Sequence, residues 1–356
     1  MSGEAIAGLL ADPGPFASVY IEVSREGATG AKSAGLAARN AVDQLRDQGC
    51  PDQVCELIKD RLDGTDHHAT PVSRCLVASE RGLLLDELSS TSPQQTTAAW
   101  DALPDIAGWL TDTDEAGTFV LALVDHEGGD VATYRSSTGQ IELRAEAGGA
   151  SPWEHKVRGG AWSHWNLQRS TETVWARNAE EVVAEIGRQL TPEVGLIVVG
   201  GEADVRSQVA TADQDWRAEV VELESARREI GEDDELIAGQ IGQLLYGRAV
   251  ARRLAAVHDL HARMGQGHGF AIGTADVTDA LIEGRVGSLL IDVGAAAGHV
   301  IDTADHPGMQ LGAVEAPGRL RADRVLLAMA GLTDGEIVMT RTSTMSGAPV
   351  AALLRW

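Results

Sequence analysis

A basic segment in the middle of the chain, residues 155–170, contains the residue types best suited to contact a nucleic acid. It holds three cations and no acid, a Gly-Gly pair that lets the backbone bend freely, and two of the chain's eight tryptophans. Cations that pair with phosphates and rings that stack on bases are what a loop needs to approach folded RNA. The candidate RNA-binding residues are Lys156, Arg158, Gly159, Gly160, Ala161, Trp162, Ser163, His164, Trp165 and Arg169.

A purely structural interpretation of the same segment stays open. In that interpretation it is a mobile surface turn, and Trp165 and Trp175 pack in the core, where large aromatic side chains are commonly found.

The net charge restricts how a basic loop can act. The chain has 53 acidic and 29 basic residues, which gives a net charge of −24. Phosphate repels so negative a body, which argues against non-specific wrapping of nucleic acid. We therefore expect any RNA contact to be confined to the basic loop and geometrically specific.

Length and composition indicate a globular protein of two or three domains, because 356 residues exceed one typical domain and 44% are hydrophobic. The sequence has no apolar run of about 18 residues and no signal-peptide pattern, so we expect a cytoplasmic protein. Three cysteines, Cys50, Cys55 and Cys75, lack the spacing of a zinc knuckle or a redox pair, and we expect reduced structural thiols.

Alternating strand and helix patterns predict an α/β fold in which three domains position the loop. The first, residues 1–115, is an N-terminal α/β domain whose final segment, 93–114, reads as polar and irregular. The second, residues 116–228, is a middle domain with the Gly-Gly loop, and the third is a C-terminal domain over residues 229–356. In the first domain we expect a strand at 18–23, helices at 31–48 and 53–62, and a hairpin formed by 74–79 and 82–85.

The middle domain follows a β-α-β order. A long amphipathic helix is predicted after the basic segment, because Asn178, Val182 and Ile186 belong to a set that recurs every three or four residues between 167 and 190. Strands are expected at 118–125, 131–134, 141–144, 194–199 and 219–223, with a short helix from 202. In the third domain we expect helices at 236–264, 274–283 and 321–330 and strands at 288–292, 336–339 and 351–356.

The other candidate motifs carry no clear chemistry. Glycines separate a strand from a helix at 199–202, as in phosphate-binding turns, but Glu202 and Asp204 occupy the place of the phosphate. Two histidine pairs, His67-His68 and His258 with His261, have no convincing third ligand. We therefore expect neither a cofactor nor a metal site.

The order of several short motifs resembles archaeal and eukaryotic class 1 peptide chain release factors. Arg158-Gly159-Gly160, then a long helix, then a strand over 195–201 followed by Ala203-Asp204 is similar to their central domain. Motifs of the third domain are similar to their C-terminal domain: residues 269–273, 276–277, 280–281, 284–286, 289–291 and the ending 352–356. The likeness spans roughly residues 116–356, and with bacterial relatives of these factors, the Balon-type ribosome hibernation family, it extends over the N-terminal domain.

One departure changes what the resemblance implies. In the release factors a glutamine after Gly-Gly helps to place the water that attacks the peptidyl-tRNA ester, and here that position is Ala161, followed by Trp162. A methyl group cannot order water, and an indole offers only a donor. The N-terminal domain also lacks the Asn-Ile-Lys-Ser element used in stop-codon recognition.

The resemblance therefore implies a non-catalytic hibernation or stress factor in the ribosomal A site. Its loop would lie near the peptidyl transferase centre of the 70S ribosome, and the resemblance implies elongation factor Tu as a delivery partner. Two alternatives stay open: a peptidyl-tRNA hydrolase that uses backbone N–H groups and His164, and an acidic regulatory protein that no longer acts on the ribosome.

Overall fold

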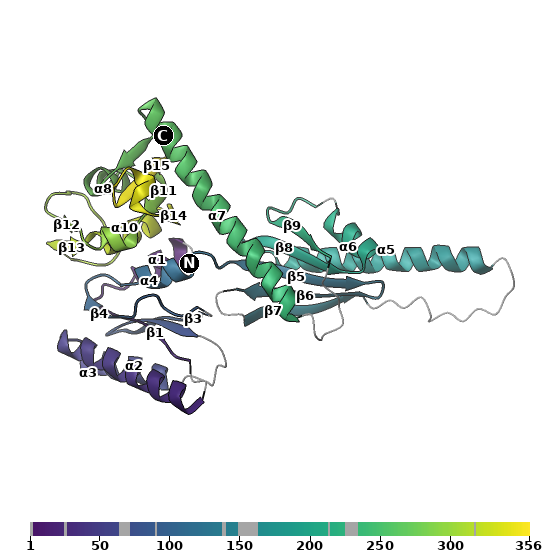
Figure 1. Ribbon diagram of the computed structural model, residues 1–356, viewed down its shortest axis with the longest axis horizontal. Helices are drawn as coiled ribbons and strands as arrows, with labels where there is room; N and C mark the ends of the chain where they lie inside the picture. Colours follow the sequence, from purple (N-terminus) through teal and green to yellow (C-terminus); the bar gives the residue numbers. More distant parts are fainter. Residues whose placement is uncertain are drawn as a thin grey trace. The chain divides into compact units, whose positions relative to one another are not determined.

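The computed structural model describes residues 3–24, 27–63, 72–89, 91–136, 140–148, 163–212, 214–224, 234–316 and 318–356. The chain forms two compact units, one that combines Met1–Glu115 with Arg248–Trp356 and one made of Ala116–Gly247. Both units pack helices against sheets (Figure 1), so the predicted α/β fold class is confirmed.

The first unit begins with a four-stranded antiparallel sheet of order β3-β2-β1-β4. Alternate residues of β1 face opposite sides, as in any strand: Val19 faces one core, and Phe16 and Tyr20 face another. α2 and α3 cover the Val19 side (Figure 1), and α1 and α4 contribute to the other core. The elements are α1 (Gly3–Leu9), β1 (Phe16–Glu22), α2 (Gly27–Asp47), α3 (Asp52–Asp63), β2 (Ser73–Ser79), β3 (Gly82–Ser89), β4 (Thr97–Asp101) and α4 (Ala107–Asp112).

The irregular segment expected at 93–114 is in fact partly regular, and that expectation was wrong. β4 pairs with β1 as an edge strand, and Trp109 of α4 is buried. The Gln48 side chain accepts a hydrogen bond from the Trp100 N–H at 2.7 Å and donates one to the Ala98 carbonyl at 3.1 Å. A distant side chain thus satisfies backbone groups of β4, and no local pattern of polarity reports that contact.

The C-terminal part of the first unit is a second four-stranded sheet of order β10-β15-β11-β14, in which β11 and β14 are parallel. The terminal strand predicted at 351–356 is confirmed as β15, which spans Val350–Leu354. The elements are β10 (Phe270–Ile272), α8 (Thr274–Ile282), β11 (Val286–Ile291), α9 (Val293–Ala296), β12 (Val300–Asp302), β13 (Arg319–Arg321), α10 (Ala322–Leu332), β14 (Glu336–Met339), the 3₁₀ helix η1 (Thr342–Met345) and β15 (Val350–Leu354).

One core joins the two sheets of the first unit. Val325 and Leu326 of α10 belong to the same buried cluster as Phe16 and Tyr20 of β1. Within this unit the buried Arg324 also donates to Asp105 at 2.5 Å, and charges buried this far from water are stabilised by such pairing. These contacts explain why the two ends of the chain form one compact body.

The second unit is built on a five-stranded sheet of order β7-β6-β5-β8-β9. β5 is antiparallel to β6 and parallel to β8, and β8 and β9 are parallel with α6 between them, which confirms the β-α-β order predicted for 194–223. α5 and α6 pack on one face through residues such as Val182, and the first part of α7 packs on the other through Ile237 and Ile241. The elements are β5 (Thr118–Asp125), β6 (Gly128–Arg135), β7 (Gln140–Gly148), α5 (Ser163–Gln189), β8 (Val194–Gly201), α6 (Ala203–Ala210), β9 (Glu219–Leu223) and α7 (Asp234–Gln266).

Each of the three expected domains contains one of the larger sheets, while α7 begins in the second unit and ends in the first. The boundaries at residues 115 and 228 stay predictions. Cys50, Cys55 and Cys75 are free and buried, as expected. Among the described helices, none is both long and apolar enough to cross a membrane.

Candidate functional site

The basic loop leaves the second unit between the end of β7 and the start of α5. Six of the predicted RNA-binding residues lie outside the described residues: Lys156, Arg158, Gly159, Gly160, Ala161 and Trp162. The other four, Ser163, His164, Trp165 and Arg169, lie in the first two turns of α5. The structure therefore describes the elements that hold the loop, and the contacts of its side chains stay predictions.

The loop starts from one defined edge of the sheet. β7 is antiparallel to β6, which is antiparallel to β5, so β5, β7 and β8 all end at the same edge. In sheets of this kind the carboxyl edge is where functional loops usually gather.

Three glycines let the backbones meet closely at this edge. Gly128 and Gly148 face each other across β6 and β7, and a Cβ on Gly128 would lie 2.2 Å from the Ala147 carbonyl oxygen. A Cβ on Gly129 would lie 3.0 Å from Val182 of α5. Only glycine fits at 128 and 148, where φ is positive and backbone atoms lie in the place of a Cβ, so β6 and β7 meet closely at the end of β7.

Asn178 fastens α5 to the same edge. Its side chain is fully buried, and its Nδ2 donates a hydrogen bond of 2.9 Å to the carbonyl of His126, the first residue after β5. Asn178 belongs to the predicted amphipathic stripe of α5, but its spacing in that stripe did not show that its side chain bonds to the turn after β5.

Toward its N-terminus, α5 continues away from the sheet (Figure 1). The residues of α5 that precede Asn178 run from Ser163 to Arg177, and at 1.5 Å per residue they extend the helix by about 22 Å. The loop is thus attached to the tip of a long arm whose base is fixed at the sheet edge.

A buried polar network fixes the other end of α5. Gln189 accepts a hydrogen bond from Thr133 of β6 at 2.9 Å and donates to Glu185 at 2.9 Å. The hydrogen bond from Gln189, opposed by burial and helped by Arg188, lowers the pKa of Glu185. Since both ends of this half of α5 bond to the sheet, the helix has a rigid base.

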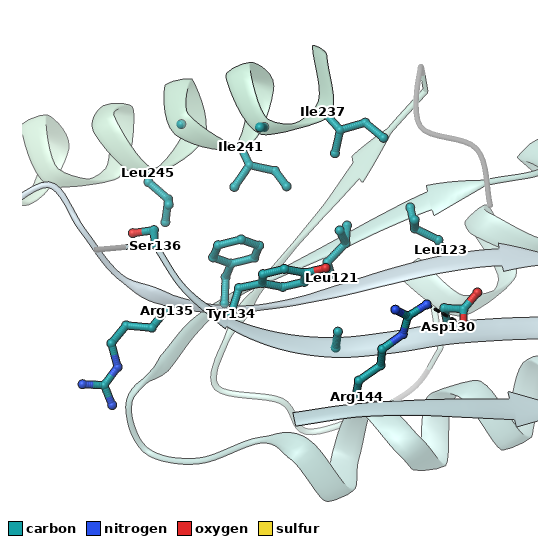
Figure 2. A pocket seen from close by; sticks show the side chains of 14 residues that line it. Leu121, Leu123, Asp130, Tyr134, Arg135, Ser136, Arg144, Ile237, Ile241 and Leu245 are labelled. Atoms are coloured by element: carbon teal, nitrogen blue, oxygen red, sulfur yellow. Dashed lines mark ion pairs between the residues drawn. The ribbon is translucent and has the colours of Figure 1, made fainter. Parts of the chain in front are cut away.

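The opposite face of the sheet holds a cavity of about 580 Å³ beside α7 (Figure 2). Phe119 and Tyr134 stack there with ring centroids 5.3 Å apart and 8° between the planes. An ion pair of 3.7 Å between Arg144 and Asp130 lies at one end. Sequence reasoning did not find this cavity, because strand alternation shows which residues share a face and not where a helix leaves that face uncovered.

A family model matches most of the second unit and the whole of α7. Residues 118–266 match the model of bacterial archaeo-eukaryotic release factor family 2. The predicted resemblance to bacterial relatives of the class 1 release factors is confirmed over these residues.

The chain is also similar to two curated proteins of Mycobacterium tuberculosis. The uncharacterized protein Rv2629 of strain H37Rv and the uncharacterized protein MT2704 of strain CDC 1551 are each 25% identical over 300 residues, covering 82% of this chain and 78% of theirs.

Similar solved structures include the archaeal translation termination factor aRF1, at 14% identity, with 100% of this chain and 99% of that chain covered and a TM-score of 0.23. Ribosome-bound archaeal Pelota is 13% identical, with 100% and 94% covered and a TM-score of 0.40. Dom34 of S. cerevisiae is 9% identical, with 80% and 79% covered and a TM-score of 0.41.

Proposed function

We propose that this protein binds the ribosome in the A site as a non-catalytic hibernation or stress factor, with its basic loop near the peptidyl transferase centre. The observation that carries the proposal is α5, which is anchored at the sheet edge by Asn178 and extends about 22 Å beyond it to the basic loop. The match to a release factor family over this unit supports a ribosome-associated role.

In this proposal the negative charge of the protein explains why the basic loop is placed at the end of a long helix. With a net charge of −24, most of the protein is repelled by rRNA, so a basic tip on a long helix separates the repelled body from the contact. Lys156, Arg158 and Arg169 would pair with phosphates, and Trp162, His164 or Trp165 would stack on bases.

The loop sequence supports binding without hydrolysis. Ala161 follows the Gly-Gly pair and offers no group that orders water. Loss of one well-placed polar group of this kind costs on the order of a hundredfold in rate. A cytoplasmic location, which is expected from the apolar pattern of the sequence, and delivery by elongation factor Tu, which the resemblance implies, belong to the same proposal.

Co-sedimentation with 70S ribosomes tests the proposal. The double charge reversal Lys156→Glu with Arg158→Glu should weaken binding at least about tenfold at moderate salt, and wild-type binding should fall as salt rises. The matched control is Lys32→Glu with Arg39→Glu on the exposed side of α2, which also changes the net charge from −24 to −28.

Equal loss of binding in both double variants would show that only overall charge matters, and full binding by the loop variant would show that the loop is not the anchor. A peptidyl-tRNA hydrolysis assay separates the alternatives: robust release by the unmodified protein would favour the hydrolase. Complete absence of ribosome binding would favour a regulatory protein that acts elsewhere.

A further inference from the structure

Three side chains that can bind metals meet at the sheet edge from which the loop departs. His126 directly follows β5, Glu202 directly follows β8, and Asp204 lies in the first turn of α6. The two strands are parallel neighbours with Val124 opposite Gly201, so the residues after their ends are brought together. Of the described residues, these three form the group whose ligand atoms all lie within 4.8 Å of one another.

The backbone brings the two turns unusually close. Gly201 has φ +121°, and a Cβ there would lie 1.9 Å from the Val124 carbonyl oxygen. The same carbonyl accepts a hydrogen bond of 3.0 Å from the Glu202 N–H. These contacts set the start of α6 directly against the end of β5.

The distances fit a shared ion. Nε2 of His126 lies 3.0 Å from Oε2 of Glu202 and 3.5 Å from Oδ2 of Asp204. Imidazole nitrogens and carboxylate oxygens bind Zn²⁺ at about 2.0–2.2 Å, so two such ligands at a tetrahedral angle are roughly 3.4 Å apart. Small side-chain movements would therefore place all three atoms around one ion.

Charge also favours a cation at this position. Two carboxylates approach one ring nitrogen, and a single imidazolium would leave the group with one uncompensated negative charge. The acids occupy the turn in which a phosphate-binding protein would hold its anion, so the turn is suited to the opposite charge. Their exposure, 51% for Glu202 and 67% for Asp204, leaves room for water as a further ligand.

The histidine comes from a turn that is already fixed. Its carbonyl accepts the hydrogen bond of the buried Asn178, and Oδ1 of Asp125 accepts bonds from the N–H groups of Glu127 at 2.8 Å and Gly128 at 3.0 Å. Because the turn is preorganised, little conformational freedom is lost when a ligand binds.

We propose that His126, Glu202 and Asp204 bind one divalent transition-metal ion, of which Zn²⁺ is the best match. The imidazole makes the set better suited to such an ion than to Mg²⁺ or Ca²⁺, which prefer oxygen ligands alone. The ion joins the β5–β6 turn to the start of α6 and so reinforces the base of the arm. The proposed function does not depend on the ion, because the Asn178 hydrogen bond and the pairing of β5 with β8 hold the base of the arm without it.

Isothermal titration of the chelator-treated full chain with Zn²⁺ and with Mg²⁺ tests the site. We expect one Zn²⁺ per chain and at least about tenfold weaker binding of Mg²⁺. Glu202→Gln combined with Asp204→Asn should weaken Zn²⁺ binding at least about tenfold, and His126→Asn should do the same. Both acids are exposed, so the double variant should fold normally.

His306→Asn is the matched control, because His306 pairs with one carboxylate, Asp279, at 2.8 Å and should leave Zn²⁺ binding unchanged. The proposal is overturned if the unmodified chain binds no Zn²⁺, or if the double variant binds it as tightly as the wild type. Equal affinity for Mg²⁺ and Zn²⁺ would overturn the role of the imidazole.

Discussion

Replacing Asn178 by Ala should loosen the base of the arm. Asn178 is 0% exposed and its Nδ2 donates a bond of 2.9 Å to the His126 carbonyl. Loss of the bond leaves that carbonyl without this donor, beside a helix position that is itself fully buried. We expect a cost of about 2 kcal/mol, which corresponds to a roughly thirtyfold larger population of the locally opened state.

Native-state hydrogen exchange measures that opening in the full chain, because it reports each segment separately. Amides of α5 from 178 to 189 should exchange faster, whereas those of α10 in the first unit should not change. Asn178→Asp should open the site further, since a carboxylate cannot donate and would face the carbonyl.

The neighbouring residue provides the control. Arg177 is 70% exposed and forms an ion pair of 3.1 Å with Glu181 one turn along α5, so Arg177→Ala should cost only about 0.3–0.5 kcal/mol, or roughly a twofold change in exchange. If Asn178→Ala changes exchange no more than Arg177→Ala does, the hydrogen bond does not anchor the helix and the reasoning is refuted.

Two further predictions follow from titratable groups. Burial, with Cys55 beside it, raises the pKa of Cys50 to about 12, and burial raises the pKa of Cys75 well above its usual range. Thiol reagents react with the thiolate, so at about pH 8 they should label the native chain slowly. The same reagents should label all three thiols of the urea-unfolded chain rapidly. Rapid labelling of the native chain would contradict this. The pKa of Glu185 is lowered in the folded state, so its stabilising effect is present above its ordinary pKa of 4.5 and is lost as the pH falls through the folded value. Glu185→Gln should therefore reduce the acid sensitivity of hydrogen exchange in α5, and an unchanged pH profile would show that the carboxylate contributes nothing.

Local patterns predicted the second unit well, because its strands and helices carry strong periodicity. The continuous apolar run at 194–199 is β8, buried between β5 and β9, and the stripe through Val182 and Ile186 is the face of α5 that meets the sheet. In such segments the side chains that determine the local structure are the ones that form the core.

The assembly of the first unit could not be predicted, because it depends on long-range contacts that no local sequence pattern reports. The core shared by Phe16 and Val325 and the buried pair of Arg324 with Asp105 join residues more than two hundred positions apart. Sequence alone reads the two ends of the chain as separate domains, because periodicity reports that a face is apolar and not which distant face covers it.

Because local patterns do not report long-range contacts, the sequence alone did not predict the proposed metal site of His126, Glu202 and Asp204. His126 and Glu202 are separated by the whole of the loop and α5, and only the parallel pairing of β5 with β8 brings them to one edge. The acids alone argued against phosphate, whereas the acids together with the histidine argue for a cation. The edge thus combines two opposite electrostatic requirements: anionic side chains at the base, where the sheet is held together, and cationic side chains at the tip. About 22 Å of α5 separates the anchor at Asn178 from the start of the helix, which is more than twice the Debye length of about 8 Å at physiological ionic strength, so the acidic base does not neutralise the basic loop.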